Sequence, residues 1–291
     1  MKSRTCRMPV LLLIISWNFQ LLSAAEPPAE IPFKLYGGFA IVVRGAIGSQ
    51  DNLNFLVDTG AVPSVVHQRL ARKLSLSGPR ENISVVSQSQ PVERVAVPQM
   101  RLGLIEFPSV SAVVLDLAPI EKQLGLRLDA IVGLDVLGRQ DFTIDYRLRQ
   151  ILIGAGATTG KAIPFELRKE AGAPYVVVGM EMNSQSVRLL LDTGADGITL
   201  FAARMEGRSL VLQKSGLSKD VSAGGEYAVE RVQLADVRLG GMKRGKRQAT
   251  IVETAALALR DFDGMLSPTA LGIRRMAFDF RSRIVYVQID R

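Results

Sequence analysis

The chain has 291 residues, of which 47% are apolar, and its 36 Lys and Arg exceed its 28 Asp and Glu to give a formal net charge of +8. This composition is typical of a globular protein with one large domain or two smaller ones, and it excludes a disordered or collagen-like chain. Cys6 and His67 are the single cysteine and histidine. Zinc and transition-metal sites need several such ligands, so we expect no metal, no cofactor and no disulfide framework.

The first 25 residues are predicted to be a signal peptide. Three basic residues lie within the first seven positions, an apolar run spans 9–22, and small residues at 23–25 fit a cleavage site. This run is shorter than the roughly 20 apolar residues of a membrane-spanning helix. We therefore expect an exported protein, periplasmic or secreted, that contacts a membrane only if this segment stays uncleaved.

The elements predicted after this segment are mainly β-strands. Short β-branched or alternating runs predict strands, in chain order, at 39–43, 92–100, 142–146, 151–153, 175–178, 229–237, 276–280 and 284–289. Helical signals are brief: Ser64 is predicted to cap a helix running to Leu74, and 119–124 to form a turn or two. The expected fold class is all-β, mainly antiparallel, with few short helices.

A long internal repeat divides the chain. Matching segments are IPFKL at 31–35 with IPFEL at 163–167, LVDTGA at 56–61 with LLDTGA at 190–195, VERV at 92–95 with VERV at 229–232, and DYR at 145–147 with DFR at 279–281. The matches keep their order, while their offsets drift by a few residues and recover, as loop insertions between equivalent strands produce. We predict two homologous lobes, 31–154 and 161–291, joined by a linker of small residues at 155–160.

Asp-Thr-Gly occurs once in each half, and both copies follow an apolar run. If the lobes pack about a two-fold axis, Asp58 and Asp192 meet face to face and share a proton, because two adjacent carboxylates cannot both ionise cheaply. A water between an acid and a base can attack an amide carbonyl without metal, histidine or thiol. A single Asp-Thr-Gly also fits an ordinary turn, but two copies at equivalent places after apolar strands favour a catalytic pair.

The residues beside each aspartate have supporting roles in this interpretation. Thr59 and Thr193 can donate their hydroxyls to backbone across the lobe interface. Gly60 and Gly194 let the chain turn sharply and bring backbone N–H groups near the carboxylates.

These motifs resemble those of aspartic proteases of the pepsin and retropepsin kind, most closely bacterial retropepsin-like domains in tandem, over nearly all of the chain after residue 25. The resemblance implies a bilobed acid-protease fold, catalytic Asp58 and Asp192, and a peptide or protein substrate. In that family two apolar residues and a glycine follow later in each lobe and pack behind the catalytic loop. The sequence at 131–133, Ile-Val-Gly, fits; the second lobe has Met-Leu-Ser at 265–267, and we expect the small Ser267 to be tolerated.

The resemblance also implies β-hairpin flaps over the cleft, near 87–90 and 222–227. Gly224 and Gly225 suit a mobile hairpin tip, and Tyr227 is either a substrate contact or an ordinary strand aromatic. Asp196 resembles the retroviral residue that binds the substrate main chain, while Val62 occupies the matching place in the first lobe.

Two functions follow from the sequence. One is an exported aspartic endopeptidase. The other is a catalytically silent, bilobed peptide-binding protein of the same fold, which Ser267 and the absence of an aromatic residue in the first flap would favour. In either case we expect a monomer that binds no nucleic acid.

Several other features are predicted to be structural. His67 is expected at the surface of the helix after the first catalytic loop. The basic run 243–247 is expected in a solvated loop, because it lacks the interleaved aromatics of single-stranded nucleic-acid binders. Asp116, Asp135 and Asp236 are expected to be surface or turn carboxylates.

Overall fold

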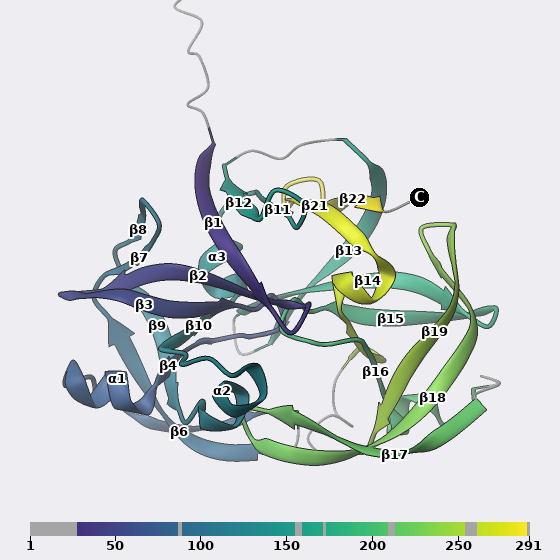
Figure 1. Cartoon of the computed structure of the whole chain (residues 1–291), viewed down its shortest axis with the longest axis horizontal. Helices are drawn as coiled ribbons and strands as arrows, with labels where there is room; N and C mark the ends of the chain where they lie inside the picture. Colours follow the sequence, from purple (N-terminus) through teal and green to yellow (C-terminus); the bar gives the residue numbers. More distant parts are fainter. Residues whose placement is uncertain are drawn as a thin grey trace, which may run out of the picture.

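The computed structural model describes residues 28–86, 89–154, 159–170, 173–208, 213–253 and 261–289. The predicted signal peptide and four linker residues, 155–158, lie outside the described residues. In Figure 1 the first lobe and the second lobe stand side by side, with a group of strands from both lobes above them. The fold is mostly β with few short helices, as expected.

The described part of the first lobe contains twelve strands and three short helices. They are β1 (Ala29–Tyr36), β2 (Ala40–Ile47), β3 (Gln50–Val57), β4 (Ser64–His67), α1 (Gln68–Lys73), β5 (Arg80–Ser84), β6 (Ser89–Val97), β7 (Met100–Leu102), β8 (Ile105–Phe107), β9 (Val110–Leu115), α2 (Ala118–Leu124), β10 (Ala130–Val132), α3 (Leu134–Leu137), β11 (Phe142–Asp145) and β12 (Gln150–Ile153).

The second lobe repeats this order with longer hairpins. Its described elements are β13 (Lys161–Glu170), β14 (Ala173–Met182), β15 (Gln185–Leu191), β16 (Ile198–Phe201), α4 (Ala202–Met205), β17 (Gln213–Ser222), β18 (Gly225–Leu239), β19 (Met242–Val252), β20 (Gly264–Leu266), the 3-10 helix η1 (Pro268–Leu271), β21 (Ile273–Asp279) and β22 (Ile284–Ile289). None of the described helices has the length and apolar character needed to cross a membrane.

The two lobes have the same sheet topology. The first lobe pairs its strands in the order β1-β2-β3-β10-β4-β9-β6-β5. The second lobe pairs β13-β14-β15-β20-β16-β19-β18-β17. Most pairs are antiparallel, but β3–β10 and β4–β9 are parallel, as are their equivalents β15–β20 and β16–β19. Of these strands, β4, β10, β16 and β20 are buried at every position, as central strands covered on both faces are.

A third, antiparallel sheet joins the lobes in the order β1-β12-β11-β21-β22-β13. Its central pair has the register Phe142↔Phe278, Thr143↔Ala277, Ile144↔Met276. Thr143 and Ala277 are 134 residues apart, which is the offset of the repeat. The register therefore maps onto itself when the lobes are exchanged, and a pseudo-two-fold axis passes through this pair.

Two of the predicted elements are wrong. Residues 64–67 form strand β4, and the helix begins only at Gln68, where the ring nitrogen of His67 accepts the N–H of Arg69. Tertiary pairing of β4 with β9 and β10 buries Val65 and Val66 and outweighs the capping tendency of Ser64.

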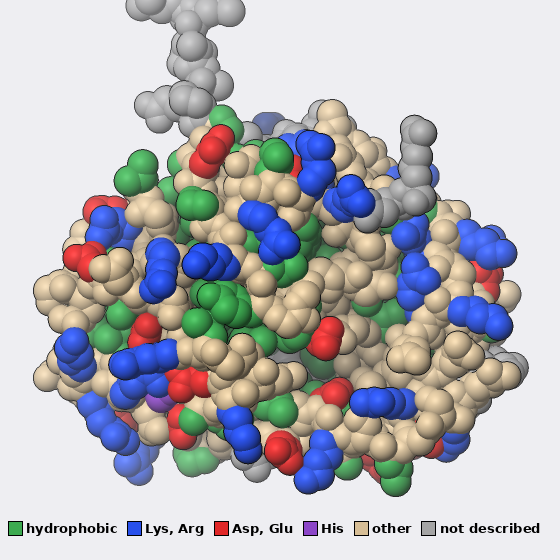
Figure 2. Space-filling model, in the orientation of Figure 1, with side chains coloured by type: hydrophobic (Ala, Val, Ile, Leu, Met, Phe, Trp, Pro, Cys, Tyr) green, Lys and Arg blue, Asp and Glu red, His purple; other side chains and the backbone are tan. Residues whose placement is uncertain are grey.

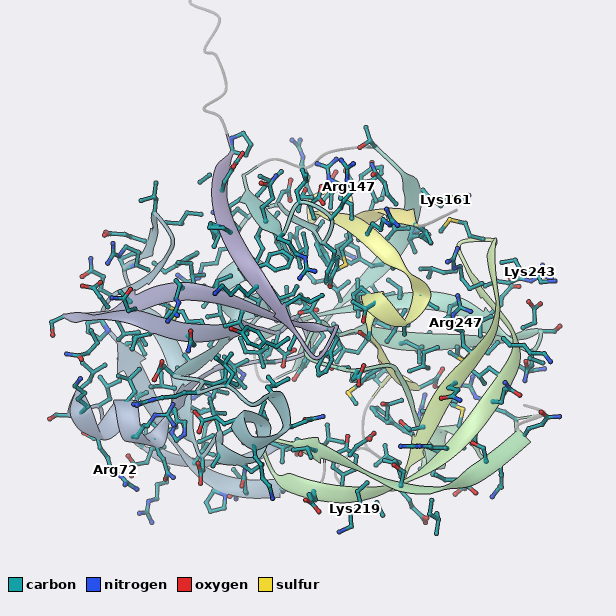
Figure 3. All side chains as sticks on the ribbon, in the orientation of Figure 1. Arg72, Arg147, Lys161, Lys219, Lys243 and Arg247 are labelled. Atoms are coloured by element: carbon teal, nitrogen blue, oxygen red, sulfur yellow. The ribbon has the colours of Figure 1, made fainter. Side chains whose placement is uncertain are left out.

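The basic run 243–247 also differs from its prediction, because it lies within strand β19. The turn before it falls at Gly240 and Gly241, whose positive φ angles, 53° and 79°, favour glycine. Lys243 points outward at the edge of the molecule (Figure 3). Basic side chains are spread over the face shown in Figure 2, with acidic ones among them.

Candidate active site

Two buried strands deliver the aspartates to the interface between the lobes. Strand β3 ends at Val57 and strand β15 ends at Leu191, and an aspartate follows each. The backbone N–H of Asp58 donates to the carbonyl of Val132 over 3.0 Å, and that of Asp192 donates to the carbonyl of Leu266 over 2.9 Å. Each Asp-Thr-Gly loop is thus held by a neighbouring parallel strand: β10 holds the loop after β3, and β20 holds the loop after β15.

The two carboxyl groups share a hydrogen bond at the bottom of the interface. Oδ1 of Asp58 accepts the backbone N–H groups of Gly60 (2.8 Å) and Ala61 (3.1 Å). The second loop repeats this pattern at the same distances, with Asp192 accepting from residues 194 and 195. The structure therefore brings together the two aspartates that the repeat pairs.

Both loop glycines face the opposite carboxyl group. A Cβ on Gly60 would lie 2.5 Å from a carboxyl oxygen of Asp192, and a Cβ on Gly194 would overlap the carboxyl of Asp58 in the same way. Only glycine allows the two loops to approach this closely.

The two threonines cross the interface and lock the loops together. The backbone N–H of Thr59 donates to Oγ1 of Thr193 (3.0 Å), and the N–H of Thr193 donates to Oγ1 of Thr59 (3.1 Å). Each hydroxyl in turn donates to a carbonyl of the other lobe, Thr59 to Leu191 (2.6 Å) and Thr193 to Val57 (2.9 Å). Both threonines are buried, so these four bonds are shielded from water and hold the aspartates in register.

Burial changes the acidity of the pair. Loss of solvent raises the pKa of Asp58, although hydrogen bonds partly oppose this shift. Burial raises the pKa of Asp192 well above its usual value, and the nearby charge of Asp58 raises it further. The pair therefore keeps a proton at pH values at which free aspartates lose theirs. Burial also raises the pKa of Tyr175, beside the pair, to about 12.

A cleft of about 700 Å³ opens above the aspartates and is lined by both lobes. The hairpins β5–β6 and β17–β18 occupy the positions expected for the flaps, although residues 87 and 88 at the first tip are outside the described chain. Asp196 and Tyr227 line the cleft, whereas Gly224 and Gly225 lie at the second hairpin's turn and do not. Ala223, beside them, packs on an apolar cluster of the first lobe.

The loops behind the aspartates differ in their small residue. In the first lobe a Cβ on Gly133 would overlap the carbonyl oxygen of Ala61. The hydroxyl of Ser64 accepts the N–H of Gly133 (2.9 Å) and donates to Asp135 (2.7 Å). Asp135 is therefore a support of this loop, and its prediction as a surface or turn carboxylate is wrong.

In the second lobe the hydroxyl group belongs to Ser267, a residue of the loop behind Asp192, and not to the neighbouring strand. Position 198, equivalent to Ser64, is isoleucine, and position 267, equivalent to Gly133, is serine. The backbone of Ser267 takes φ −71° and ψ 130°, against −98° and −172° at Gly133. Its Oγ bonds to Oγ1 of Thr269 over 2.9 Å, and its N–H donates to the carbonyl of Gly197. Asp192 keeps the same bonds as Asp58, so Ser267 is accommodated.

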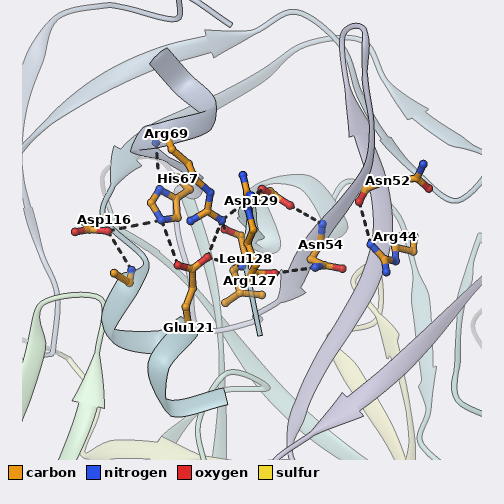
Figure 4. A network of polar contacts seen from close by, with 11 residues as sticks. Arg44, Asn52, Asn54, His67, Arg69, Asp116, Glu121, Arg127, Leu128 and Asp129 are labelled. Atoms are coloured by element: carbon orange, nitrogen blue, oxygen red, sulfur yellow. Dashed lines mark hydrogen bonds and ion pairs between the residues drawn. The ribbon is translucent and has the colours of Figure 1, made fainter. Parts of the chain in front are cut away.

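His67 is buried, with 4% of its surface exposed, and its surface prediction is wrong. Its Nε2 lies 3.6 Å from a carboxylate oxygen of Asp116 and 3.7 Å from one of Glu121. Arg69 joins Glu121 to Asp129 in the same network (Figure 4). Burial, and then the charge of Arg69, lower the pKa of His67, so the imidazole is neutral at neutral pH. This network ties β4 and α1 to α2 and does not reach the aspartate pair.

Sequence reasoning did not single out three further cleft residues. Tyr175, Asp220 and Arg231 line the cleft from β14, β17 and β18. The repeated Val-Glu-Arg-Val was a signal for Arg231, since its match places Arg94 in the same cleft. No group of three or more potential metal ligands occurs in the part of the chain that the structure describes.

Comparison with known proteins agrees with this architecture. A family model described as aspartyl protease matches residues 43–136 and again residues 178–273, so that each lobe carries one match with its own Asp-Thr-Gly. None of the curated proteins matches the chain. Because the two matches together span more than half of the sequence and coincide with the two halves of the site, the chain belongs to the aspartyl protease family.

Proposed function

We propose that the protein is an exported aspartic endopeptidase that hydrolyses peptide bonds with a water activated by Asp58 and Asp192. The observation that carries this proposal is the hydrogen-bonded pair of carboxyl groups at the floor of a cleft that both lobes line. A volume of about 700 Å³ lies within the range typical of ligand sites. Since one chain supplies both aspartates, a monomer is sufficient.

The raised pKa values of the pair support a mechanism with one proton between two carboxyl groups. The ionised carboxylate takes a proton from the water as its oxygen attacks the peptide carbonyl carbon, and the protonated carboxyl donates to the carbonyl oxygen. The tetrahedral intermediate then collapses: the C–N bond breaks, the carboxyl that took the proton from water gives it to the leaving amine, and a hydroxyl of the intermediate returns a proton to the other aspartate. The backbone N–H groups on Oδ1 of each aspartate hold both carboxyls in position throughout.

The same cleft also fits the second function, a silent peptide-binding protein. Ser267 was one argument for it, but the hydroxyl of Ser267 is satisfied and the loop of Asp192 repeats the loop of Asp58. These contacts favour turnover.

Digestion of a diverse peptide library with the wild type and with Asp58→Asn and Asp192→Asn tests the proposal. Asparagine keeps an oxygen for the loop N–H groups but cannot exchange the proton, so cleavage should fall by about 10²–10⁴-fold with the fold unchanged. The matched control is Asp51→Asn. Asp51 is exposed on β3, seven residues before Asp58 and about 23 Å away along the strand.

Full activity in either dyad variant would refute the assignment. A wild type that binds peptides and cleaves none would establish the binding protein instead. Export is tested separately by measuring the molecular mass of the protein recovered outside the cytoplasm. The mass should correspond to a chain that begins at Glu26.

A further inference from the structure

The two halves of the cleft are built from equivalent elements but differ in chemistry. On the catalytic loops, Val62 of the first lobe corresponds to Asp196 of the second. On the parallel strand pairs, Val65 faces Val113 in the first lobe, whereas the equivalent pair in the second lobe is Thr199 with Thr250, whose hydroxyls lie 3.2 Å apart.

The flap hairpins also differ, with a more polar residue in the second lobe than at the equivalent position of the first. When the two Val-Glu-Arg-Val segments are aligned, Gln90 is equivalent to Tyr227. Gln90 pairs with Ile83 across the first hairpin, and Tyr227 pairs with Asp220 across the second. Ile83 and Asp220 therefore occupy equivalent positions, and both line the cleft. At four equivalent positions, an aliphatic residue of the first lobe is an acid or a threonine in the second.

The first-lobe half of the cleft is apolar and electrically balanced. Leu56, Val65 and Ile131 form part of its floor and belong to one buried cluster. Apart from Asp58, its charged side chains are Glu81 and Arg94, and these neutralise each other through two parallel hydrogen bonds. A large apolar side chain fits this half, because burying it there leaves no charge unpaired.

The second-lobe half carries an excess of carboxylates. Asp196 lies on the catalytic loop and Asp220 lies on the flap, so they face the cleft from two walls. Burial raises the pKa of both carboxyls; the charge of Asp220 raises the pKa of Asp196 further, whereas Arg231 partly opposes the rise in the pKa of Asp220. Within the described residues Asp196 has no hydrogen-bond or ion-pair partner through its side chain. The position equivalent to Glu81, which holds Arg94, is Ser218, so the described lining of this half has two acids, Asp196 and Asp220, for one guanidinium, that of Arg231.

We propose that the peptides cleaved by this protein carry a large apolar side chain in the first-lobe half of the cleft and a lysine or arginine in the second-lobe half, on opposite sides of the scissile bond. This inference rests on the proposed function. The cationic head of the substrate would lie between Asp196 and Asp220, and its aliphatic stem would lie along the ring of Tyr227. The hydroxyls of Thr199 and Thr250 supply further polar contacts on the floor.

Matched peptides test this inference. Each peptide has leucine on one side of a single peptide bond and, on the other side, lysine or norleucine, in both orders; norleucine keeps the aliphatic stem of lysine and lacks its ammonium group. We expect kcat/KM for one order of the lysine peptide to exceed that of the norleucine peptide by about tenfold, the value of one ion pair of roughly 1.4 kcal/mol. The product masses identify the bond that is cut.

The repeat supplies the variants. Asp196→Val and Asp220→Ile place the first-lobe residue at the equivalent second-lobe position, and they should remove the preference for lysine, so that kcat/KM for the lysine peptide no longer exceeds kcat/KM for the norleucine peptide. Asp196→Asn and Asp220→Asn keep the shape of the side chains if the apolar variants unfold. Asp51→Asn, remote from the cleft, should keep the preference.

The two hypotheses fail in different ways. Equal cleavage of the lysine and norleucine peptides would overturn the specificity inference and leave the endopeptidase intact. If the wild type cleaves no peptide, the proposed function fails. The inference is then decided by calorimetric titration of the same peptides, in which tighter binding of lysine supports it and equal binding overturns it.

Discussion

At the scale of single residues, the site depends on two carboxyl groups that are costly to bury together. Each aspartate receives two backbone N–H groups, which compensate part of the lost solvation. Burial still raises both pKa values, and the charge of Asp58 adds to the shift of Asp192. The proton that the proposed mechanism needs is thus retained at a cost in stability.

Removing one of these charges should stabilise the protein at neutral pH. The folded state keeps a proton above the ordinary aspartate pKa of 3.8, where the unfolded chain has lost it. The free energy of unfolding therefore falls as the pH rises through this range. Asp192→Asn removes the carboxyl with the larger rise in pKa and should reduce that fall, so its melting temperature should exceed that of the wild type at pH 7, by about 2–4 °C for each kcal/mol gained.

The difference should vanish below pH 3.8, where both states of the wild type are protonated. Differential scanning calorimetry between pH 3 and pH 8 measures it, with Asp51→Asn as the control for loss of one negative charge. A variant less stable than the wild type at pH 7 would mean that the carboxyl makes a favourable net contribution, contrary to this account.

At the scale of elements, the loops behind the aspartates show how a duplicated structure can hold the same catalytic loop with different side chains. The first lobe uses a glycine packed on backbone and a hydroxyl from β4, and the second uses a loop serine bonded to its own 3-10 helix. The two loops should therefore respond differently to the same substitution.

Gly133→Ala and Ser267→Ala form a matched pair. A methyl group at 133 overlaps the carbonyl of Ala61, next to Gly60, and should lower the free energy of unfolding by about 1–3 kcal/mol or more and reduce activity. Ser267→Ala loses one hydroxyl contact with Thr269, which is worth about 0.5–1.5 kcal/mol. Urea denaturation and kcat/KM measure both effects, and equal losses in the two variants would contradict the assigned difference.

At the scale of the whole molecule, the interlobe sheet joins the two lobes whose interface holds the aspartates. The rings of Phe142 and Phe278 stack across the central strand pair with centroids 4.5 Å apart, and Phe280 packs beside them. The axis that passes through this sheet also relates the two Asp-Thr-Gly loops, so we expect a change in the sheet to alter how these loops meet.

Phe278→Ala should therefore affect both stability and catalysis. Loss of this fully buried ring should lower the free energy of unfolding by about 3–5 kcal/mol, and kcat should fall because the lobes lose their fixed relation. Phe107→Ala is the control, since Phe107 is also buried but lies on β8, outside the interlobe sheet. Activity is assayed well below both melting temperatures, and an equal kcat in the two variants would show that the sheet does not position the dyad.

The sequence by itself determined the two lobes, their all-β class and the pairing of Asp58 with Asp192. These properties can be predicted from the periodicity of the strands and from the order of the repeated segments, because equivalent segments fold alike in both lobes. The flap hairpins were predicted from the resemblance to aspartic proteases.

Only the tertiary structure decided which side chains are buried and which of them meet. His67 was predicted at the surface, yet the packing of β4 under α2 buries it. Ser64 was predicted to cap a helix, yet it lies in strand β4, because that strand pairs with both β9 and β10. The acidic half of the cleft also depends on the tertiary structure. Asp196 and Asp220 are 24 positions apart, and they line the same cleft only because the flap folds over the Asp-Thr-Gly loop. Such contacts depend on faces that distant segments present to each other, and local sequence does not encode them.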